Sequence, residues 1–113
     1  MMDTDRGVPT IAEAARQIKA GMLSPVTLVK NCLSRIDQYE PTIQAFHVIF
    51  ADEALAAAET AEKEIEAGHY RGPLHGIPIG LKDVFYLKGY KTTSNSRVMQ
   101  NFQADEDAAV VTR

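Results

Sequence analysis

The sequence has a single cysteine, Cys32, and no long run of apolar residues. One cysteine cannot form an internal disulfide, so the composition favours a reducing compartment, and we expect a cytoplasmic protein. The opening stretch MMDTDRGVPT lacks the cationic head and apolar core of a secretory signal. No window approaches the roughly 18 apolar residues that a membrane span needs, so we expect no membrane contact.

Concentrated charge and metal-ligand patterns are also lacking. The net charge is -3 at pH 7, and the lysines and arginines are scattered among acids, which argues against direct binding of nucleic acid. The three histidines, His47, His69 and His75, fall on different expected elements at no ligand-like spacing, so we predict no metal site. There is no glycine-rich phosphate loop and no internal repeat.

The residues that are present fit a small globular unit. The 113 residues are 45% hydrophobic and 24% charged, a balance typical of one domain with a modest core. Residues 10–68 are predicted to be mainly helical, because their apolar residues recur at helical spacing. Thr10 followed by Glu13 is the pattern of a capping box, and Gly21 is expected to stop this first helix.

A second helix is predicted from Ser24 as the cap and Pro25 at the first helical position. Pro41 should end it. Cys32 lies on its apolar stripe and is interpreted as a small core residue rather than a nucleophile.

Two further elements follow before residue 70. The stretch AFHVIF, residues 45–50, is rich in β-forming residues and predicts a short strand. Residues 51–68 are rich in alanine, carry acids early and end in Gly68, which predicts a third helix.

Residues 70–96 have a different character. The stretch HGIPIGLKDVF, residues 75–85, is mostly apolar and predicts a buried strand, yet Lys82 lies near its middle. In an extended chain Lys82 would share its face with Gly80 and Pro78, which leaves room around the lysine. The spacing leaves two interpretations open: a lysine that points to solvent and guards a strand edge, or a lysine held where water is scarce.

The segment TTSNS, residues 92–96, is dense in hydroxyl groups. Ser94 or Ser96 near a lysine suggests a serine–lysine pair, but hydroxyls at such density more often satisfy the backbone of a turn. Asn95 suits a position with positive φ. We therefore predict a turn here rather than a nucleophile.

The last predicted element is a helix over residues 105–113. Asp105, Glu106 and Asp107 suit its first turn, but the sequence ends before any helix stop signal. The strand around Lys82 also looks buried on both faces, as in large covered sheets. We therefore expect the chain to be the front part of a longer protein.

Taken together, GPLHGIPIGLKDVF at residues 72–85 and the following TTSNS resemble the amidase signature family, the Ser–cisSer–Lys hydrolases. The SPVTLV helix start, the AFHVIF segment, the alanine-rich helix and the DAAVV residues are similar to the N-terminal region of that family. The resemblance runs from residue 10 to residue 113 and is most specific at residues 72–85.

The resemblance implies that Lys82 is the catalytic general base. In the family this lysine acts through a cis-serine on a nucleophilic serine, and both serines belong to a downstream glycine- and serine-rich signature that this sequence lacks. Lysine can take a serine proton only when it is neutral, a form that burial among apolar groups favours. The chain alone should therefore be inactive. Asp83, on the opposite face of an extended chain, should make structural hydrogen bonds. Asn95 departs from the glycine usual in the family.

The resemblance also implies an α/β fold, with a mixed sheet between helices, in which residues 1–113 are the N-terminal part of a single amidase domain. We expect helices at 10–68, the lysine strand and loop at 70–96, and the start of a helix at 105–113. The family hydrolyses carboxamides through an acyl-enzyme without metal or organic cofactor. The expected partner is a small-molecule amide substrate, and a homo-oligomer is left open.

Two other interpretations stay open. One is the glutaminase subunit of a tRNA-dependent amidotransferase, which works with another protein and with charged tRNA. The other is a non-catalytic interaction module, which the missing serines favour if the 113 residues are the whole gene product.

Overall fold

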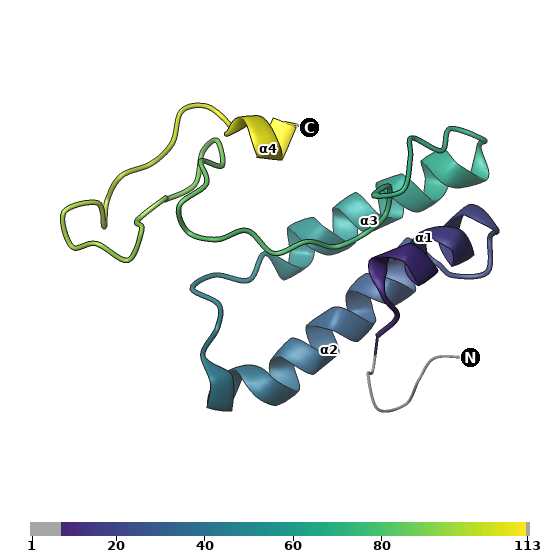
Figure 1. Ribbon diagram of the computed structural model, residues 1–113, viewed down its shortest axis with the longest axis horizontal. Coiled ribbons are helices and arrows are strands. Elements are labelled where there is room, and N and C mark those ends of the chain that lie inside the picture. The colour runs from purple at the N-terminus through teal and green to yellow at the C-terminus, as the bar shows by residue number, and fades with distance from the viewer. Residues whose placement is uncertain (1–7, 113) are drawn as a thin grey trace. The chain divides into compact units, whose positions relative to one another are not determined.

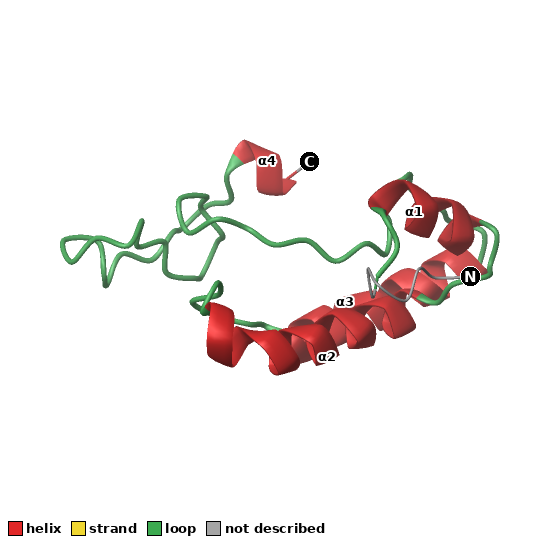
Figure 2. Ribbon diagram, turned by 60° about the horizontal axis from the view of Figure 1, so that its bottom comes forward, coloured by secondary structure: helices red, strands yellow, loops and turns green. Residues whose placement is uncertain are grey.

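The computed structural model describes residues 8–112, and the chain divides into two compact units, Met1–Pro78 and Ile79–Arg113. The first unit is helical and contains α1 (Ile11–Lys19), α2 (Pro25–Ile43) and α3 (Ala51–Glu66), as Figure 1 shows. The second is mostly irregular and contains the short α4 (Ala109–Thr112), as the colouring by secondary structure makes plain (Figure 2).

Residues 1–7 and Arg113 lie outside the described part of the chain, so the predicted lack of a secretory signal at the N-terminus stays a sequence-based prediction. Within the described part, none of the helices combines the length and the apolar character needed to cross a membrane. The same residues form no strand, only one isolated bridge. The described chain is thus helical and irregular, and the α/β class stays a prediction for a larger fold.

The start of α1 confirms the predicted capping box. Thr10 Oγ1 accepts the Glu13 backbone N–H at 3.2 Å, and Glu13 Oε2 accepts the Thr10 backbone N–H at 2.8 Å. Two backbone donors that the helix itself cannot satisfy are thereby paired. Gly21, with φ 75°, follows the last turn, as the sequence predicted.

The start of α2 is as predicted, but its end is not. Ser24 Oγ accepts the N–H groups of Val26 and Thr27 at 3.1 and 3.3 Å, with Pro25 next to it. The helix continues through Pro41 to Ile43, so the prediction that Pro41 ends it was wrong. A proline this close to the C-terminus removes only one N–H from the ladder, and the remaining turn tolerates that loss.

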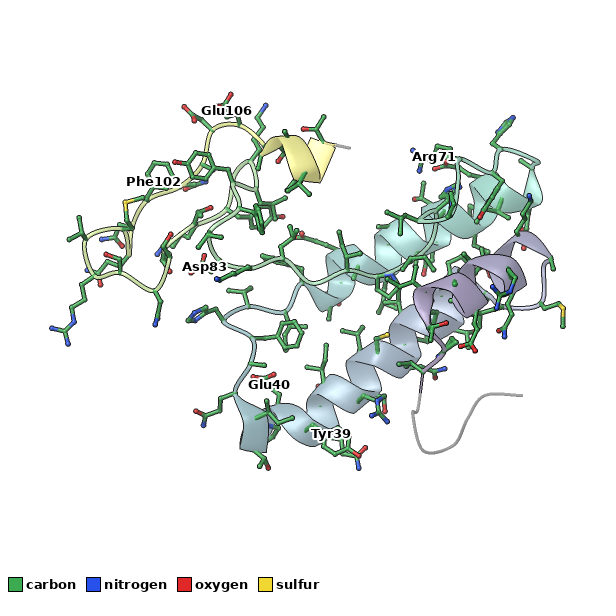
Figure 3. All side chains as sticks on the ribbon, in the orientation of Figure 1. Tyr39, Glu40, Arg71, Asp83, Phe102 and Glu106 are labelled. Carbon is green, nitrogen blue, oxygen red and sulfur yellow. The ribbon has the colours of Figure 1, made fainter. Side chains whose placement is uncertain are left out.

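The segment between α2 and α3 corrects another prediction, because residues 45–50 are irregular rather than a strand. The Phe46 N–H donates to Glu40 Oε1 at 2.9 Å, where Glu40 belongs to the last turns of α2 (Figure 3). Gln44, with φ 53°, turns the chain out of the helix. A strand needs a second strand to satisfy its backbone, and the described residues place none beside this segment.

The core of the helical unit lies where its three helices meet. Figures 1 and 2 both show α2 and α3 side by side. The buried residues Ala14, Ile18 and Leu28 form its centre. Partly buried apolar residues pack around them, namely Leu23, Cys32, Ile65 and Ile77. Cys32 is therefore part of the core, as predicted.

The irregular unit is closed by backbone pairing between its two halves. Lys91 and Gln103 form an antiparallel bridge. Next to it, the Thr92 N–H donates to the Phe102 carbonyl and the Ala104 N–H to the Tyr90 carbonyl, each at 3.1 Å. This pairing holds residues 86–92 against residues 102–108.

The helix predicted over residues 105–113 is shorter than expected, since α4 begins only at Ala109. Asp107 does not stand in a first helical turn. Its Oδ1 accepts the Lys88 backbone N–H at 2.7 Å, so this carboxylate closes the loop instead. The acidic triplet thus belongs to a turn, which explains the late start of the helix.

Candidate functional site

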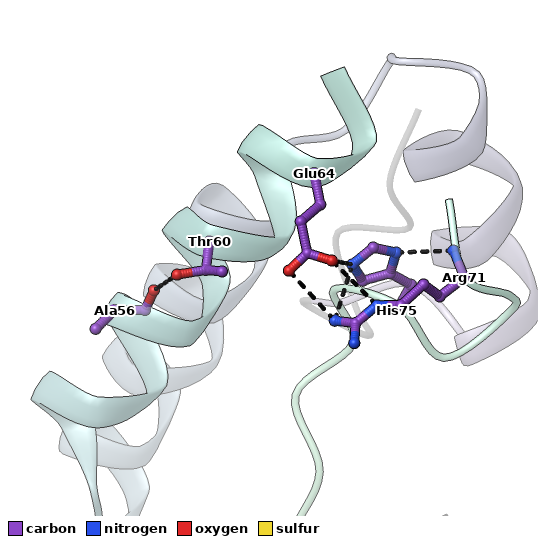
Figure 4. A network of polar contacts seen from close by, with 5 residues as sticks. All are labelled: Ala56, Thr60, Glu64, Arg71 and His75. Atoms are coloured by element: carbon purple, nitrogen blue, oxygen red, sulfur yellow. Dashed lines mark hydrogen bonds and ion pairs between the residues drawn. The ribbon is translucent and has the colours of Figure 1, made fainter. Parts of the chain in front are cut away.

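The approach to the Lys82 segment is anchored by a buried histidine. His75 is 8% exposed, and its Nδ1 accepts the Arg71 backbone N–H at 3.0 Å. Because Nδ1 accepts, the hydrogen-bond pattern assigns the proton of a neutral ring to Nε2, which lies 3.5 Å from Glu64 Oε2. Arg71 Nε lies 3.1 Å from the same oxygen (Figure 4). Glu64 thereby ties both residues to α3.

Sequence reasoning missed this network. It considered His75 only as a metal ligand and rejected that role, and nothing in the spacing of Glu64, Arg71 and His75 shows that they meet. The one feature of the sequence that could have drawn attention to this network is a histidine followed directly by glycine and an apolar run. Within the part of the chain that the structure describes, no cluster of three or more histidine, cysteine, aspartate or glutamate side chains is arranged to hold a metal ion.

Gly76 packs the same segment closely against α1 and α2. Its φ is 84°, and a Cβ at this position would lie 2.8 Å from Pro25 Cγ and 3.7 Å from Ile18 Cδ1. Only glycine allows both this backbone conformation and this approach. Ile77 then packs on the central core. Residues 75–77 are thus held by α1, α2 and α3 together.

Lys82 lies on a turn, so the prediction of a strand over residues 77–85 was wrong. Its carbonyl accepts the N–H groups of Val84 and Phe85 at 2.7 and 3.1 Å. Two such bonds to one carbonyl reverse the chain locally. The residues before it are irregular, for the same reason as residues 45–50: the described chain offers them no neighbouring strand.

The surroundings of Lys82 also differ from the expectation. Lys82 is exposed, and the apolar residues beside it are exposed as well, namely Leu81, Val84 and Phe85. The described residues therefore do not by themselves build the water-poor environment that a lysine base needs.

Asp83, the residue after the lysine, makes the structural hydrogen bonds that were expected of it. Its Oδ1 accepts the Thr93 N–H at 3.0 Å, and its Oδ2 accepts the Thr93 hydroxyl. Its backbone carbonyl accepts the Ser94 N–H at 2.8 Å. Asp83 is half-buried and lies in the irregular unit, where Figure 3 labels it. The sequence did not identify Thr93 as its partner.

The segment TTSNS forms the predicted turn. Asn95 has φ 57°, as expected, and Ser94 has φ 49°. The Ser96 N–H donates to the Thr93 carbonyl at 2.8 Å, and Ser96 Oγ accepts the Val98 N–H at 3.2 Å. The hydroxyl of Ser96 thus serves the backbone of the turn.

Comparison with known proteins places the sequence in a family. The family described as Amidase matches residues 27–113, a range that contains Lys82, Asp83 and the TTSNS turn. A glutamyl-tRNA(Gln) amidotransferase subunit of Chloroflexus aurantiacus is 41% identical over 104 residues, which cover 92% of this chain and 21% of that protein. The same subunit of Dehalococcoides mccartyi is 43% identical over 102 residues, covering 90% of this chain and 21% of that protein.

A third relative has a different name. "Putative amidase AmiD" of Mycobacterium tuberculosis is 32% identical over 124 residues, with all of this chain and 26% of that protein covered. The chain thus spans about a fifth to a quarter of the length of the curated relatives that it matches. The family match extends over most of the chain, and the likeness to amidases proposed from GPLHGIPIGLKDVF is confirmed: the chain belongs to the amidase family.

Proposed function

We propose that these residues are the N-terminal part of an α/β amidase that hydrolyses a carboxamide C–N bond through a serine acyl-enzyme, with Lys82 as the general base. The observation that carries the proposal is the position of Lys82 in GIPIGLKDVF, inside the region that matches the amidase family. The two serines of the mechanism would come from a longer chain, in line with relatives four to five times as long.

The proposed reaction has two stages, acylation of the serine and hydrolysis of the acyl-enzyme. Neutral Lys82 Nζ takes a proton, relayed through the cis-serine, from the hydroxyl of the nucleophilic serine. The serine oxygen attacks the amide carbon, and the C–N bond breaks as the leaving nitrogen takes that proton from Lys82 through the same relay. Water then attacks the acyl ester, which releases the acid and restores the serine hydroxyl.

The exposure of Lys82 fits this scheme if the rest of the protein covers it. The side chains of Leu81, Val84 and Phe85 beside it are apolar and each is about two-fifths exposed. A covering surface would remove water from the lysine as well as from these side chains. Desolvation penalises the ammonium and favours the neutral amine, which is the form that can accept a proton.

A second candidate function has its own support. The relatives at 41% and 43% identity both carry the name of a glutamyl-tRNA(Gln) amidotransferase subunit. We propose as the alternative that the chain is part of such a subunit, which would release ammonia from glutamine within a complex. Ammonia release from simple amides by the purified protein favours the amidase. The amidotransferase is favoured if glutamine is the only amide that releases ammonia, and if this release requires charged tRNA and the other proteins of a complex.

The role of Lys82 is tested with Lys82→Ala and Lys82→Arg in the full-length protein that contains this chain. Arginine keeps the positive charge but stays protonated and cannot serve as a base. Both variants should therefore lose about 10²–10⁴-fold in kcat/KM.

Lys88→Arg is the matched control, because it makes the same change at another exposed lysine of the same unit. Thermal melts of all variants exclude misfolding. If Lys82→Arg stays within about tenfold of the wild type, a difference of about 1.4 kcal/mol, Lys82 is not the base, and it becomes a solvated lysine on a turn.

A further inference from the structure

We propose that Asp83 and Thr93 form a clamp that positions Lys82. The inference rests on the proposed function of Lys82 and adds two residues that would act through it without touching the substrate. It is carried by the hydrogen bonds between the residue next to the lysine and the TTSNS turn, ten residues further along the chain.

The clamp joins main chain and side chain. The carboxylate of Asp83 accepts both the backbone N–H of Thr93, at 3.0 Å, and the hydroxyl of Thr93. The backbone carbonyl of Asp83 accepts the Ser94 N–H at 2.8 Å. Hydrogen bonds to a charged carboxylate are stronger than those between neutral groups, and Asp83 and Thr93 are both half-buried, which limits competition from water.

The Thr93 hydroxyl has a second task. While it donates to Asp83, it accepts the Asn95 N–H at 3.2 Å. The Thr93 carbonyl accepts the Ser96 N–H at 2.8 Å. Thr93 thereby stabilises the left-handed backbone at Ser94 and Asn95 and also hydrogen-bonds Asp83. Thr93 therefore joins the TTSNS turn to the turn that begins at Lys82.

The position of Lys82 follows from this arrangement. Its carbonyl accepts the N–H groups of Val84 and Phe85, so residues 82–85 form one tight turn, with Asp83 inside it. A clamp on Asp83 fixes the Cα of Lys82 one peptide bond away. Proton transfer depends steeply on placement, and a displacement of roughly 1 Å can lower a rate about 100-fold. Loss of the clamp should therefore lower kcat and leave KM nearly unchanged.

The experiment compares three threonine variants in the full-length protein, with kcat and KM measured on one amide substrate. Thr93→Val removes the clamping hydroxyl at constant shape and should lower kcat about 10–100-fold, with KM within about threefold. Thr93→Ser keeps the hydroxyl and should stay within about threefold of the wild type. Thr112→Val is the matched control, since Thr112 is exposed and its hydroxyl donates to the Ala108 carbonyl at 3.4 Å rather than to the turn of Lys82, and it should also stay within about threefold.

A second measurement separates positioning from general destabilisation. Adding Thr93→Val to Lys82→Ala should cause no further loss, because residues that act through one group are not additive. If Thr93→Val does not fold, Asp83→Glu replaces it, since that change keeps the charge but displaces the carboxylate by one methylene and should lower kcat in the same way.

The inference is overturned if Thr93→Val keeps at least half the wild-type kcat, if Thr112→Val loses as much, or if the loss persists in Lys82→Ala. Failure of the proposed function looks different, because Lys82→Ala would then retain wild-type activity whatever the Thr93 variants do. A loss in Lys82→Ala without one in Thr93→Val leaves Lys82 as the base and removes the clamp.

Discussion

At the scale of single residues, Gly76 is where one added methyl group should matter most in the helical unit. Gly76→Ala would place a Cβ 2.8 Å from Pro25 Cγ at φ 84°. Overpacking and left-handed strain together should destabilise the unit by about 2–4 kcal/mol. Hydrogen exchange of the amides of α1 and α2 in the full-length protein measures the loss.

Gly68→Ala is the control for that prediction. Gly68 has nearly the same φ, 89°, but a Cβ there would meet nothing within 4 Å. Gly68→Ala should therefore destabilise the unit only through left-handed backbone strain, by about 1–2 kcal/mol. Equal losses at Gly68 and Gly76 would show that Gly76 does not pack tightly against α2.

Cys32 gives a pH-dependent prediction at the same scale. Burial raises the pKa of the Cys32 thiol, and the nearby Arg35 guanidinium opposes this by a smaller amount. A raised folded-state pKa means that the neutral thiol stabilises the fold below the ordinary thiol pKa of about 8.5. That stabilisation is lost as pH rises through the folded-state value.

Melting temperatures of the wild type and Cys32→Ala between about pH 7 and pH 10 check this. The advantage of the wild type should shrink as the pH rises. A pH-independent difference would contradict the burial of the thiol. Reaction with a thiol reagent at pH 8 should also be slower in the folded protein than in urea, because only the thiolate reacts.

Local chemistry made several residues predictable. Thr10 with Glu13, and Ser24, satisfy backbone groups within three residues of themselves, so the sequence alone specifies their partners. Asn95 takes the positive φ that its residue type tolerates. The partners of Asp83 and His75 depend on how distant segments meet. No spacing rule reaches from Asp83 to Thr93, and the hydrogen bonds between them are visible only in the structure.

At the scale of elements, α2 depends on its cap. Ser24→Ala removes the acceptor of the Val26 and Thr27 N–H groups and should cost about 1 kcal/mol. Amide exchange at residues 26 and 27 should accelerate about fivefold, the factor that this free energy corresponds to. Ser34→Ala, at an exposed position in the middle of α2, is the control and should leave these rates unchanged. Equal acceleration in both variants would mean that Ser24 is not the cap.

One physical rule separates the elements that were predicted correctly from those that were not. A helix satisfies its own backbone, so α1, α2 and α3 were predictable from apolar spacing and caps. A strand needs a neighbour. The apolar segments at residues 45–50 and 77–82 have the composition of strands, but the described residues give them nothing to pair with. Sequence patterns report the preference of a segment and not the presence of its partner.

At the scale of the whole molecule, both units leave large apolar side chains exposed. In the helical unit these include Ile43, Phe46, Val48, Ile49 and Leu74. In the irregular unit they include Ile79, Leu81, Val84, Phe85, Val98 and Val110. Exposed apolar side chains that gather into a patch favour association, and extended segments with unpaired backbone invite association through their edges.

The 113-residue chain purified by itself should therefore associate or melt without cooperativity. Light scattering after size exclusion should show concentration-dependent oligomers, and a hydrophobic dye such as ANS should bind. Val48→Ser and Ile79→Ser, which make exposed apolar positions polar, should raise the monomer fraction, whereas Glu59→Gln at an exposed polar position of α3 should not. A monomer that melts in one sharp transition and binds no dye would show that the core closes on itself. The apolar residues around Lys82 would then need no covering surface, and the dry environment proposed for the base would have no source.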